Sequence, residues 1–475
     1  MVTHKTERYD EPHQFDPLMP EHAKIGPLLE RASDLTRAAT ALGASAAPAD
    51  HQELRVLLRS MNSYYTHRME GEHSRPSDID KALQQDFSAD DGLARKQRLA
   101  VAHVRTEEVC EAELEVRRAT GQDSTRWLYS ADALMWLHRE LFSNLSQRDL
   151  ALKDSSLLIP GVLRLRDVQV GEHIAPTAAS VPAFLERWSA AYGRVRRGEA
   201  SIVAAAASHH RLAWVHPFLE DNGRVARLHT HLVLQSLGLT NGLWSPLRGF
   251  ARSEEAYRAL LHAADEPRRG ALDGRGNLTL SGLIAWVDYT LGMCIEQVEF
   301  MGRQMNVRGM RDRIAAALAF EESTVKAGVR KESLAPLHYL FATQAQLGRA
   351  EFKAMTGLGE RVATGTLSAL LRRGFLASDT PYGDVRFAVP RHALRFYFPA
   401  LWPEAEQDQA LLQAESRVSG TARATDEEFQ PVAEGRWTKV LDTGKTVPWD
   451  DAKAYLKAKA LGGRARKPAA RKRRP

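Results

Sequence analysis

The chain has 475 residues, of which 44% are hydrophobic and 26% are charged. These proportions are typical of a water-soluble globular protein, and the length predicts two or three domains. No apolar run approaches about 18 residues, which argues against a membrane-spanning helix, and the polar N-terminus is unlike a signal peptide. The two cysteines, Cys110 and Cys294, are far apart. Their spacing argues against a disulfide framework or a cysteine-based zinc site and fits a reducing cytoplasm.

The net charge of +6 is concentrated at the C-terminus. The last fourteen residues, GGRARKPAARKRRP, hold seven basic residues and no acidic one, so the remainder of the chain carries 6 − 7 = −1. A basic tail of this kind binds polyanions weakly and with strong salt dependence. Residues 401–475 are therefore expected to form a small appendage followed by this tail.

Helical patterns dominate the first 150 residues. Apolar residues recur at helical spacing over residues 25–39, and a second helix is expected over about residues 51–69. Gly71 is a suitable stop for that helix, and Pro76 prevents an immediate restart. Further helical patterns fill residues 78–150.

The best strand candidate is residues 161–176, GVLRLRDVQVGEHIAP, in which valines and arginines alternate imperfectly. Two helices are expected to follow, over residues 181–194 and over the alanine-rich residues 201–215. The second helix carries His209 and His210, which we interpret as packed structural histidines rather than metal ligands.

The most informative stretch is residues 216–227, HPFLEDNGRVAR. A proline and a glycine mark a turn, and the apolar spacing that follows predicts a helix beginning near Asn222. The first turn of a helix has unpaired backbone N–H groups and the positive end of the helix dipole. Together with Arg224 and Arg227, this turn forms an anion site suited to a polyphosphate.

Two other residues of this stretch have chemistry that suits such a site. Glu220 offers hard oxygen ligands to a divalent cation. His216 stands before the loop as a candidate base, because an imidazole titrates near neutral pH.

Residues 332–400 have the pattern of a separate module. Helices are expected over residues 334–346, 349–355 and 361–376, followed by two short strands around Tyr382. Three helices and a hairpin are the order of a winged helix. The residues that could face DNA phosphates are Arg361, Thr364, Thr366, Arg372 and Arg373. In the alternative interpretation, the module packs only against the core or a protein partner.

Residues 216–227 resemble the signature of the Fic family, HPFx(D/E)GNGRxxR. The matching residues are His216, Pro217, Phe218, Glu220, Asn222, Gly223, Arg224 and Arg227. Asp221 departs from the pattern, because the family usually has glycine there. Residues 243–250 and 253–276 also resemble segments that follow the signature, so the resemblance covers roughly residues 60–305.

The resemblance implies transfer of AMP from ATP to a hydroxyl side chain of a protein. In this assignment His216 is the base, Glu220 binds Mg²⁺, and Arg224 and Arg227 hold the β- and γ-phosphates. The implied nucleotide-binding residues are Asp221, Asn222, Gly223, Arg224, Arg227 and Tyr257. Tyr257 lies where the family builds its adenine pocket, although it also fits a core position of an amphipathic helix.

The resemblance also implies that the site is regulated. Residues 66–71, THRMEG, resemble the family's inhibitory motif, (S/T)xxxE(G/N), whose glutamate pairs with the last arginine of the signature. In this chain that pair is Glu70 with Arg227, and a carboxylate can take the place of a phosphate on a guanidinium. Residues 161–176 resemble the family's β-hairpin flap, which clamps a target peptide by strand addition.

Asp221 leaves several alternatives open. A carboxylate about 4 Å from a phosphate charge repels it by about 4 kcal/mol, unless the side chain points to solvent or adds a metal ligand. Asp also tolerates a positive φ better than most residues. The transferred group could instead be UMP, phosphate or phosphocholine, or the site could remove AMP from a protein. In a further alternative, the chain is a DNA-binding regulator that only senses nucleotide.

The sequence therefore predicts a mainly α fold with a Fic helical core, a small β-hairpin flap and a winged-helix domain. The expected domains are an N-terminal helical region with the inhibitory helix (1–120), the Fic core (121–310), the winged helix (320–400) and the appendage with its tail (401–475). The expected partner is a protein target held at the flap. DNA is a second candidate through the winged helix and the tail, and a homodimer is a candidate assembly.

Overall fold

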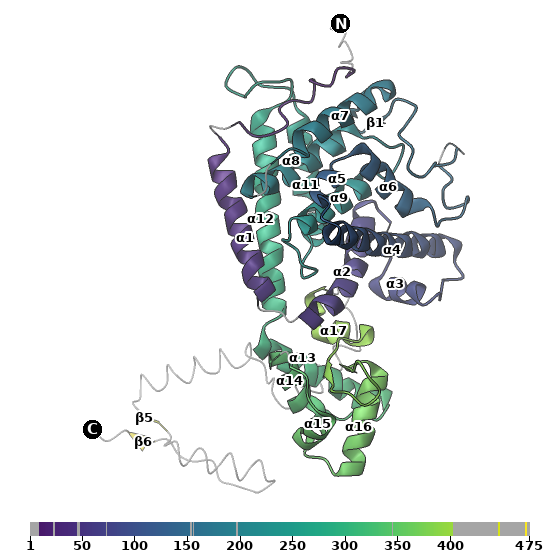
Figure 1. The fold of residues 1–475 in the computed structure, drawn as a ribbon, viewed down its shortest axis with the longest axis vertical. Coiled ribbons are helices and arrows are strands. Elements are labelled where there is room, and N and C mark those ends of the chain that lie inside the picture. The colour runs from purple at the N-terminus through teal and green to yellow at the C-terminus, as the bar shows by residue number, and fades with distance from the viewer. Residues whose placement is uncertain are drawn as a thin grey trace. The chain divides into compact units, whose positions relative to one another are not determined.

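The structure is a computed structural model that describes residues 9–401, except residues 22–23, 45–47, 73, 153, 155, 196–197 and 344, and also residues 445–446 and 471–472 (Figure 1). The chain divides into two compact units, Met1–Gln407 and Asp408–Pro475. In the second unit, strands β5 (Lys445–Thr446) and β6 (Arg471–Lys472) pair antiparallel. The rest of the predicted appendage and basic tail lies outside the described residues.

The fold is mainly helical, as expected. The helices of the first unit are α1 (Gly26–Ala44), α2 (Pro48–Met69), α3 (Pro76–Leu83), α4 (Asp91–Ala119), α5 (Ser124–Leu128), α6 (Ala131–Phe142), α7 (Val181–Tyr192), α8 (Glu199–Val215), α9 (Asn222–Ser236), α10 (Leu247–Arg252), α11 (Glu254–Asp265), α12 (Leu280–Gln304), α13 (Val307–Phe320), α14 (Leu334–Thr343), α15 (Arg349–Thr356), α16 (Glu360–Arg373) and α17 (Leu394–Tyr397). Short 3₁₀ segments lie at Ala178–Ser180, Lys331–Ser333, Arg391–Ala393 and Pro399–Leu401, and a π turn lies at Glu321–Val325. No helix in the described part of the chain is both long enough and apolar enough to span a bilayer.

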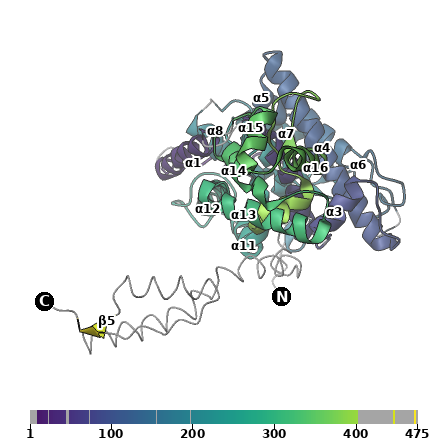
Figure 2. The same ribbon diagram turned by 90° about the horizontal axis from the view of Figure 1, so that it is seen from below.

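The helices α8 and α9 belong to the core of the first unit, and the signature lies between them. α8 is buried on almost every side, as expected for a helix of small apolar residues. α1, α7, α9 and α12 all pack against it, and α1 runs along α12 (Figure 1, Figure 2). The indole N–H groups of Trp188 and Trp286 donate to carbonyl oxygens of α8, at 3.1 and 2.7 Å. These contacts fix α8, against which α9 packs.

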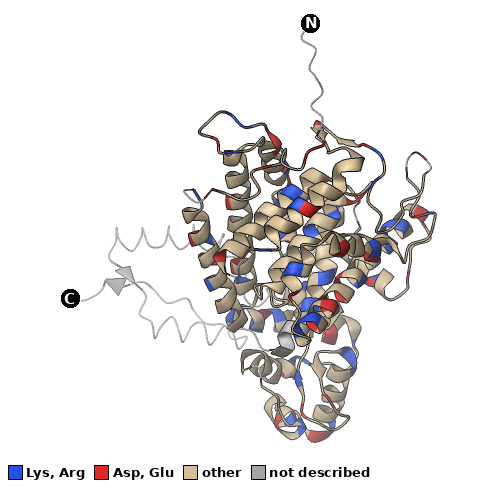
Figure 3. Ribbon diagram, turned by 45° about the horizontal axis from the view of Figure 1, so that its top comes forward, with Lys and Arg blue, Asp and Glu red and all other residues tan. Residues whose placement is uncertain are grey.

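Polar side chains join α2 to α4 along one face of each helix. The pairs are Arg55 with Glu115 (2.9 Å), Arg59 with Glu111 (2.5 Å) and Asn62 with Glu107 (2.8 Å). We call these three pairs the α2–α4 seam. Lys and Arg lie among Asp and Glu over the helices, which fits a body close to neutral in net charge (Figure 3).

The flap, residues 161–176, contains a hairpin smaller than expected. Strands β1 (Gln169–Val170) and β2 (His173–Ile174) pair antiparallel, and Gly171 has a φ of 62° in the turn between them. Residues 162–168 are not in a strand, so the strand predicted within residues 161–176 is wrong over this part. The reason is that the side chain of Arg164 bonds to backbone carbonyl groups at the end of α8, which holds this stretch as an irregular loop.

Residues 334–387 have the order of elements predicted for the C-terminal module. α14, α15 and α16 are followed by β3 (Leu376–Ala377), which pairs antiparallel with β4 (Arg386–Phe387). A further bridge joins Leu347 to Val385. The winged-helix fold itself remains a prediction.

The surface proposed to face DNA is partly corrected by the structure. Thr366 is only 2% exposed, so it packs inside the module and cannot contact a phosphate. Arg373 is engaged with Glu321 through two hydrogen bonds of 2.8 and 2.6 Å. Of the five residues predicted to face DNA, Arg361, Thr364 and Arg372 are exposed.

Candidate functional site

The signature loop is fixed at both ends by left-handed backbone conformations. His216, directly after α8, has a φ of 50°, and Asp221, directly before α9, has a φ of 64°. Two hydrogen bonds join the backbone of the buried Phe218 to the side chain of Asn222. The Phe218 N–H donates to Oδ1 of Asn222 (2.8 Å), and Nδ2 of Asn222 donates to the Phe218 carbonyl oxygen (2.9 Å). The Phe218 ring stacks on His138 of α6, with ring centroids 4.1 Å apart. The helix expected to begin near Asn222 is confirmed.

Arg164 of the flap braces this loop and was not among the predicted site residues. Its buried guanidinium donates to the carbonyl oxygens of His216 (2.8 Å), Val215 (3.4 Å) and Pro176, and its backbone N–H donates to the carbonyl of Pro217 (3.0 Å). Carbonyls at the end of a helix lack intrahelical partners and carry the negative end of the dipole. A buried cation therefore stabilises the sharp turn at His216. The sequence offered only an arginine within a strand pattern as a signal.

Glu70 forms an ion pair with Arg227. It lies directly after α2, and its Oε1 is 2.5 Å from Nη2 of Arg227. The hydroxyl of Thr66 accepts a second hydrogen bond from Nε of Arg227, at 2.9 Å. Gly223 makes this approach possible, because a Cβ there would lie 2.5 Å from Oε1 of Glu70. The pairing expected from the THRMEG motif is therefore present, and its inhibitory effect remains a prediction.

Each group of this ion pair shifts the pKa of the other toward its charged form. Burial alone would raise the pKa of Glu70, but the positive charges of Arg227 and Arg224 lower it below its ordinary value. Burial alone would lower the pKa of Arg227, but the charge of Glu70 and a hydrogen bond with Tyr257 raise it. Both groups are charged at neutral pH, and hydrogen bonds between two charged groups are stronger than neutral ones.

Arg224, the first arginine of the signature, is also held by carboxylates. Its Nη2 is 3.1 Å from Oε2 of Glu72, and its Nη1 contacts Oδ1 of Asp221. Glu72 is shared with Arg95, at 2.9 Å. Asp221 therefore faces the site rather than solvent. Burial raises the pKa of Asp221, Arg224 opposes this shift, and the carboxylate of Glu70 adds to it.

His216 has the protonation state that a general base requires. Burial lowers the pKa of its ring to about 4, and the nearby His173 and Arg164 act in the same direction. The ring is therefore neutral at pH 7 and able to accept a proton.

The remaining predicted residues lie around this centre. Glu220 is exposed on the loop, and its charge helps to raise the pKa of Asp221. The exposed carboxylate of Glu220 offers oxygen ligands of the kind that suit a hard divalent cation. Tyr257 of α11 is buried, with its hydroxyl 2.9 Å from Nε2 of His209. A contact of Tyr257 with adenine remains a prediction.

The interpretation of His209 and His210 as packed residues is confirmed. Both are fully buried, and neither lies on the signature loop. Nδ1 of His209 is 2.7 Å from the hydroxyl of Thr230 on α9, and Nε2 of His210 is 3.0 Å from the carbonyl oxygen of Leu261.

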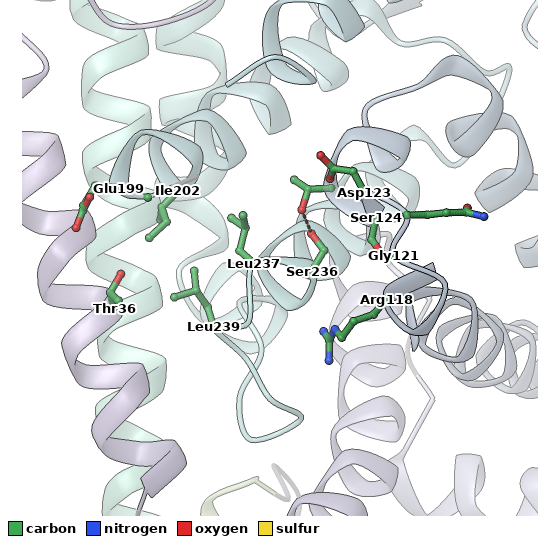
Figure 4. Close-up of a pocket in the computed structure, with 13 residues that line it drawn as sticks. Thr36, Arg118, Gly121, Asp123, Ser124, Glu199, Ile202, Ser236, Leu237 and Leu239 are labelled. Atoms are coloured by element: carbon green, nitrogen blue, oxygen red, sulfur yellow. Dashed lines mark hydrogen bonds between the residues drawn. The ribbon is translucent and has the colours of Figure 1, made fainter. Parts of the chain in front are cut away.

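A surface pocket of about 450 Å³ lies at the other end of α8 and α9 (Figure 4). Its wall includes Glu199 at the start of α8, Leu237 just after α9, and Asp123 before α5. Thr125 and Ser236 form a hydroxyl–hydroxyl hydrogen bond of 2.8 Å beside it. Because the signature joins the opposite ends of the same two helices, this pocket is separate from the signature.

Comparison with known proteins identifies the domain that carries this geometry. Residues 128–234 match the model of the Fic/DOC family. The matched range includes the flap, α8, the signature loop and nearly all of α9. A search of the curated proteins finds no match.

Solved structures similar to the chain include three Fic proteins. One is a Fic family protein from Desulfovibrio desulfuricans G20, with 17% identity, a TM-score of 0.45, and coverage of 80% of this chain and 98% of that one. Another is a Fic domain containing signaling protein from Bacteroides thetaiotaomicron VPI-5482, with 18% identity, a TM-score of 0.43, and coverage of 57% and 95%. The third is Fic-1 from C. elegans, with 16% identity, a TM-score of 0.42, and coverage of 57% and 71%. The chain thus carries a Fic/DOC domain, which the family model places at residues 128–234.

Proposed function

We propose that this protein transfers AMP from ATP to a Ser, Thr or Tyr hydroxyl of a target protein. We also propose that the segment after α2, which carries Glu70, inhibits this reaction. The observation that carries the proposal is the occupation of both signature arginines by carboxylates. Glu70 occupies Arg227, while Glu72 and Asp221 occupy Arg224. Guanidinium groups that bind carboxylates in this way also suit phosphate oxygens. Arg224 and Arg227 are accordingly the proposed partners of the β- and γ-phosphates.

The α-phosphate would bind where the signature loop meets α9. Backbone N–H groups in the first turn of a helix attract anions through their unpaired hydrogens and the helix dipole. The side chain of Asn222 is already engaged with Phe218. In this proposal the backbone of the loop therefore holds the α-phosphate, and Asn222 keeps the loop in shape.

His216 is the proposed general base. The hydroxyl oxygen of the target attacks the α-phosphorus, its proton moves to the neutral imidazole, and the bond from the α-phosphorus to the pyrophosphate oxygen breaks. Arg224 and Arg227 stabilise the negative charge that develops on the departing pyrophosphate. Glu220 is the residue that would hold Mg²⁺, which neutralises phosphate charge when it is bound.

The flap supplies the proposed docking site for the target. β1 is exposed along its length, with Val170 47% exposed. An extended segment of a target protein can add to such an edge through main-chain hydrogen bonds. Because Arg164 joins the flap to the turn at His216, a target held on β1 would be positioned relative to the base.

Glu70 accounts for the proposed inhibition. The γ-phosphate of ATP and the Glu70 carboxylate would compete for the same guanidinium, which is only 3% exposed. ATP with its phosphates correctly placed therefore requires Glu70 to leave. Removing the carboxylate should release the site without altering the base or the signature loop.

The test uses the full chain carrying Glu70→Gly, incubated with ATP labelled at the α-phosphate, Mg²⁺ and cell lysate. We expect covalent label on the chain or on a lysate protein, far less label with the original sequence, and none with Glu70→Gly/His216→Ala. His13→Ala in the same background is the control, because His13 is an exposed histidine outside the site. Normal ATP binding without any labelling would overturn the proposal. Mass spectrometry of the labelled protein gives the mass of the added group. When donors of UMP, phosphate or phosphocholine are supplied as well as ATP, this mass distinguishes those groups from AMP.

A further inference from the structure

A second group of chemically reactive side chains is buried between α4 and α9, away from the signature loop. Glu107 and Glu111 lie one turn apart on α4, and Nε2 of His231 on α9 is 3.3 Å from Oε1 of Glu107. One donor atom from each of the three lies within 4.8 Å of the others. His103 lies one turn before Glu107 on the same helix. We call these four residues the α4–α9 cluster, and each of them is only 1–3% exposed.

Several donor atoms of the α4–α9 cluster lack a protein partner. Within the described residues, both ring nitrogens of His103, Oε2 of Glu107 and Nδ1 of His231 form no hydrogen bond. The His103 ring is aimed at Glu107, with Nδ1 4.0 Å from Oε2. A buried polar group without a partner costs about 1–3 kcal/mol. Fully buried imidazole and carboxylate atoms that converge in this way indicate a ligand that accepts their lone pairs.

Residues of α2 orient the carboxylates of the α4–α9 cluster. Asn62 donates to Oε1 of Glu107 at 2.8 Å, and Arg59 pairs with Oε2 of Glu111 at 2.5 Å. Each carboxylate is thus held from α2 through one oxygen. Hydrogen bonds of this kind, made by residues outside the ligand set, fix the direction of metal-binding carboxylates in proteins.

We propose that the α4–α9 cluster is a structural site for a divalent transition-metal ion, with Glu107, Glu111 and His231 as ligands and His103 as the fourth. Two imidazoles and two carboxylates are four ligands of the types that bind Zn²⁺. Mg²⁺ and Ca²⁺ prefer oxygen ligands alone, so this ion is distinct from the one proposed at Glu220. The inference does not depend on the reaction that the signature site performs.

An ion in this position would join the two parts of the chain that meet at Arg227. His231 lies one turn after Arg227 on α9, and Asn62 lies one turn before Thr66, which bonds to Arg227 from α2. The ion would fix α4 against α9 and offset the repulsion between Glu107 and Glu111. It would thereby stabilise the frame in which Glu70 reaches the signature.

The test measures metal content directly. The full chain, without a histidine tag, is stripped with a chelator, incubated with Zn²⁺ or Mn²⁺, passed over a chelating resin and analysed by mass spectrometry of the metal. We expect about one Zn²⁺ per chain, and roughly tenfold less in Glu107→Gln and in His231→Gln, because each loses one ligand. Glu113→Gln is the matched control, since Glu113 is on the same helix and pairs with Arg117, outside the cluster, and it should keep its metal. Zn²⁺ should also raise the Tm of the original chain and of Glu113→Gln, but not that of Glu107→Gln.

Two results would overturn the proposal. One is a folded chain that retains neither Zn²⁺ nor Mn²⁺. The other is equal retention by folded Glu107→Gln, which would place any bound ion elsewhere. If both ligand variants fail to fold, crystals of the original chain grown with Zn²⁺ decide the question. An anomalous peak between α4 and α9 would support the site, and the absence of a peak there would refute it.

Discussion

The contact between Glu72 and Arg224 predicts a second restraint on the signature site, which should persist after Glu70 is removed. The charged atoms are 3.1 Å apart, and two unit charges at that distance attract by about 5 kcal/mol at an effective dielectric of about 20. Glu72 is 23% exposed and also pairs with Arg95, and exposed ion pairs retain only about 0.2–1 kcal/mol. For this partly buried, shared pair we expect about 1.4 kcal/mol, which corresponds to a tenfold change in affinity.

The assay is calorimetric titration of ATP with Mg²⁺ into Glu70→Gly and into Glu70→Gly/Glu72→Gln. We expect the Kd for ATP to fall about tenfold in the double variant, because Arg224 is freed for the β-phosphate. Asp91→Asn in the Glu70→Gly background is the control, since Asp91 is 76% exposed and pairs with Arg148, outside the site. A Kd that changes by less than about twofold would refute the reasoning, because it would mean that Glu72 does not compete with phosphate.

Three further predictions follow from the same contacts, each tested in the Glu70→Gly background. Arg164→Ala should lower kcat by about 100-fold while changing the Kd for ATP much less, because the turn that carries the base is no longer braced. Arg164→Lys should restore little of the kcat, since an ammonium lacks the planar fork of a guanidinium. A loss of ATP affinity as large as the loss of kcat would contradict the positioning role of Arg164. Asp221→Gly should tighten ATP binding by roughly 3- to 10-fold, because the change removes a carboxylate from the anion site. Glycine also accepts the φ of 64° at this position. Weaker ATP binding in calorimetry would contradict this prediction and would make Asp221 a metal ligand. Because the pKa of His216 is lowered, its ring loses its proton at unusually low pH. An NMR titration of the ring should show a midpoint of about 4. A midpoint near the ordinary value of 6.5 would contradict the burial of the ring.

The sequence predicted the centre of the site better than its surroundings. The start of α9 at Asn222 followed from local turn residues and apolar spacing, which act within a few residues of each other. The pairing of Glu70 with Arg227 came from family resemblance alone, because no local pattern joins residues 157 positions apart. Glu72 lies two residues after Glu70 and contacts Arg224 across a similar separation, and no motif marked it.

The errors have a common physical cause. Residues 162–168 have a strand-like pattern, yet the contacts of Arg164 with the end of α8 determine their conformation, and such contacts are invisible to periodicity. Thr366 was placed on a DNA-facing surface because it is polar, whereas the packing of α16 turns it inward. The position of Thr366 on a helix was predictable, but in neither region was the identity of the neighbouring element.

The segment that carries Glu70 is best understood as the end of one polar face of α2. Arg59, Asn62 and Thr66 follow one another at helical spacing, and they contact Glu111, Glu107 and Arg227 respectively. Residues three or four apart lie on the same side of a helix, so a shift of α2 along the α2–α4 seam moves Thr66 and, just beyond the helix, Glu70 together. The position of Glu70 therefore depends on buried charges of α4 as well as on Arg227. Loss of a contact along the α2–α4 seam would consequently alter the restraint on the signature without any contact with the nucleotide.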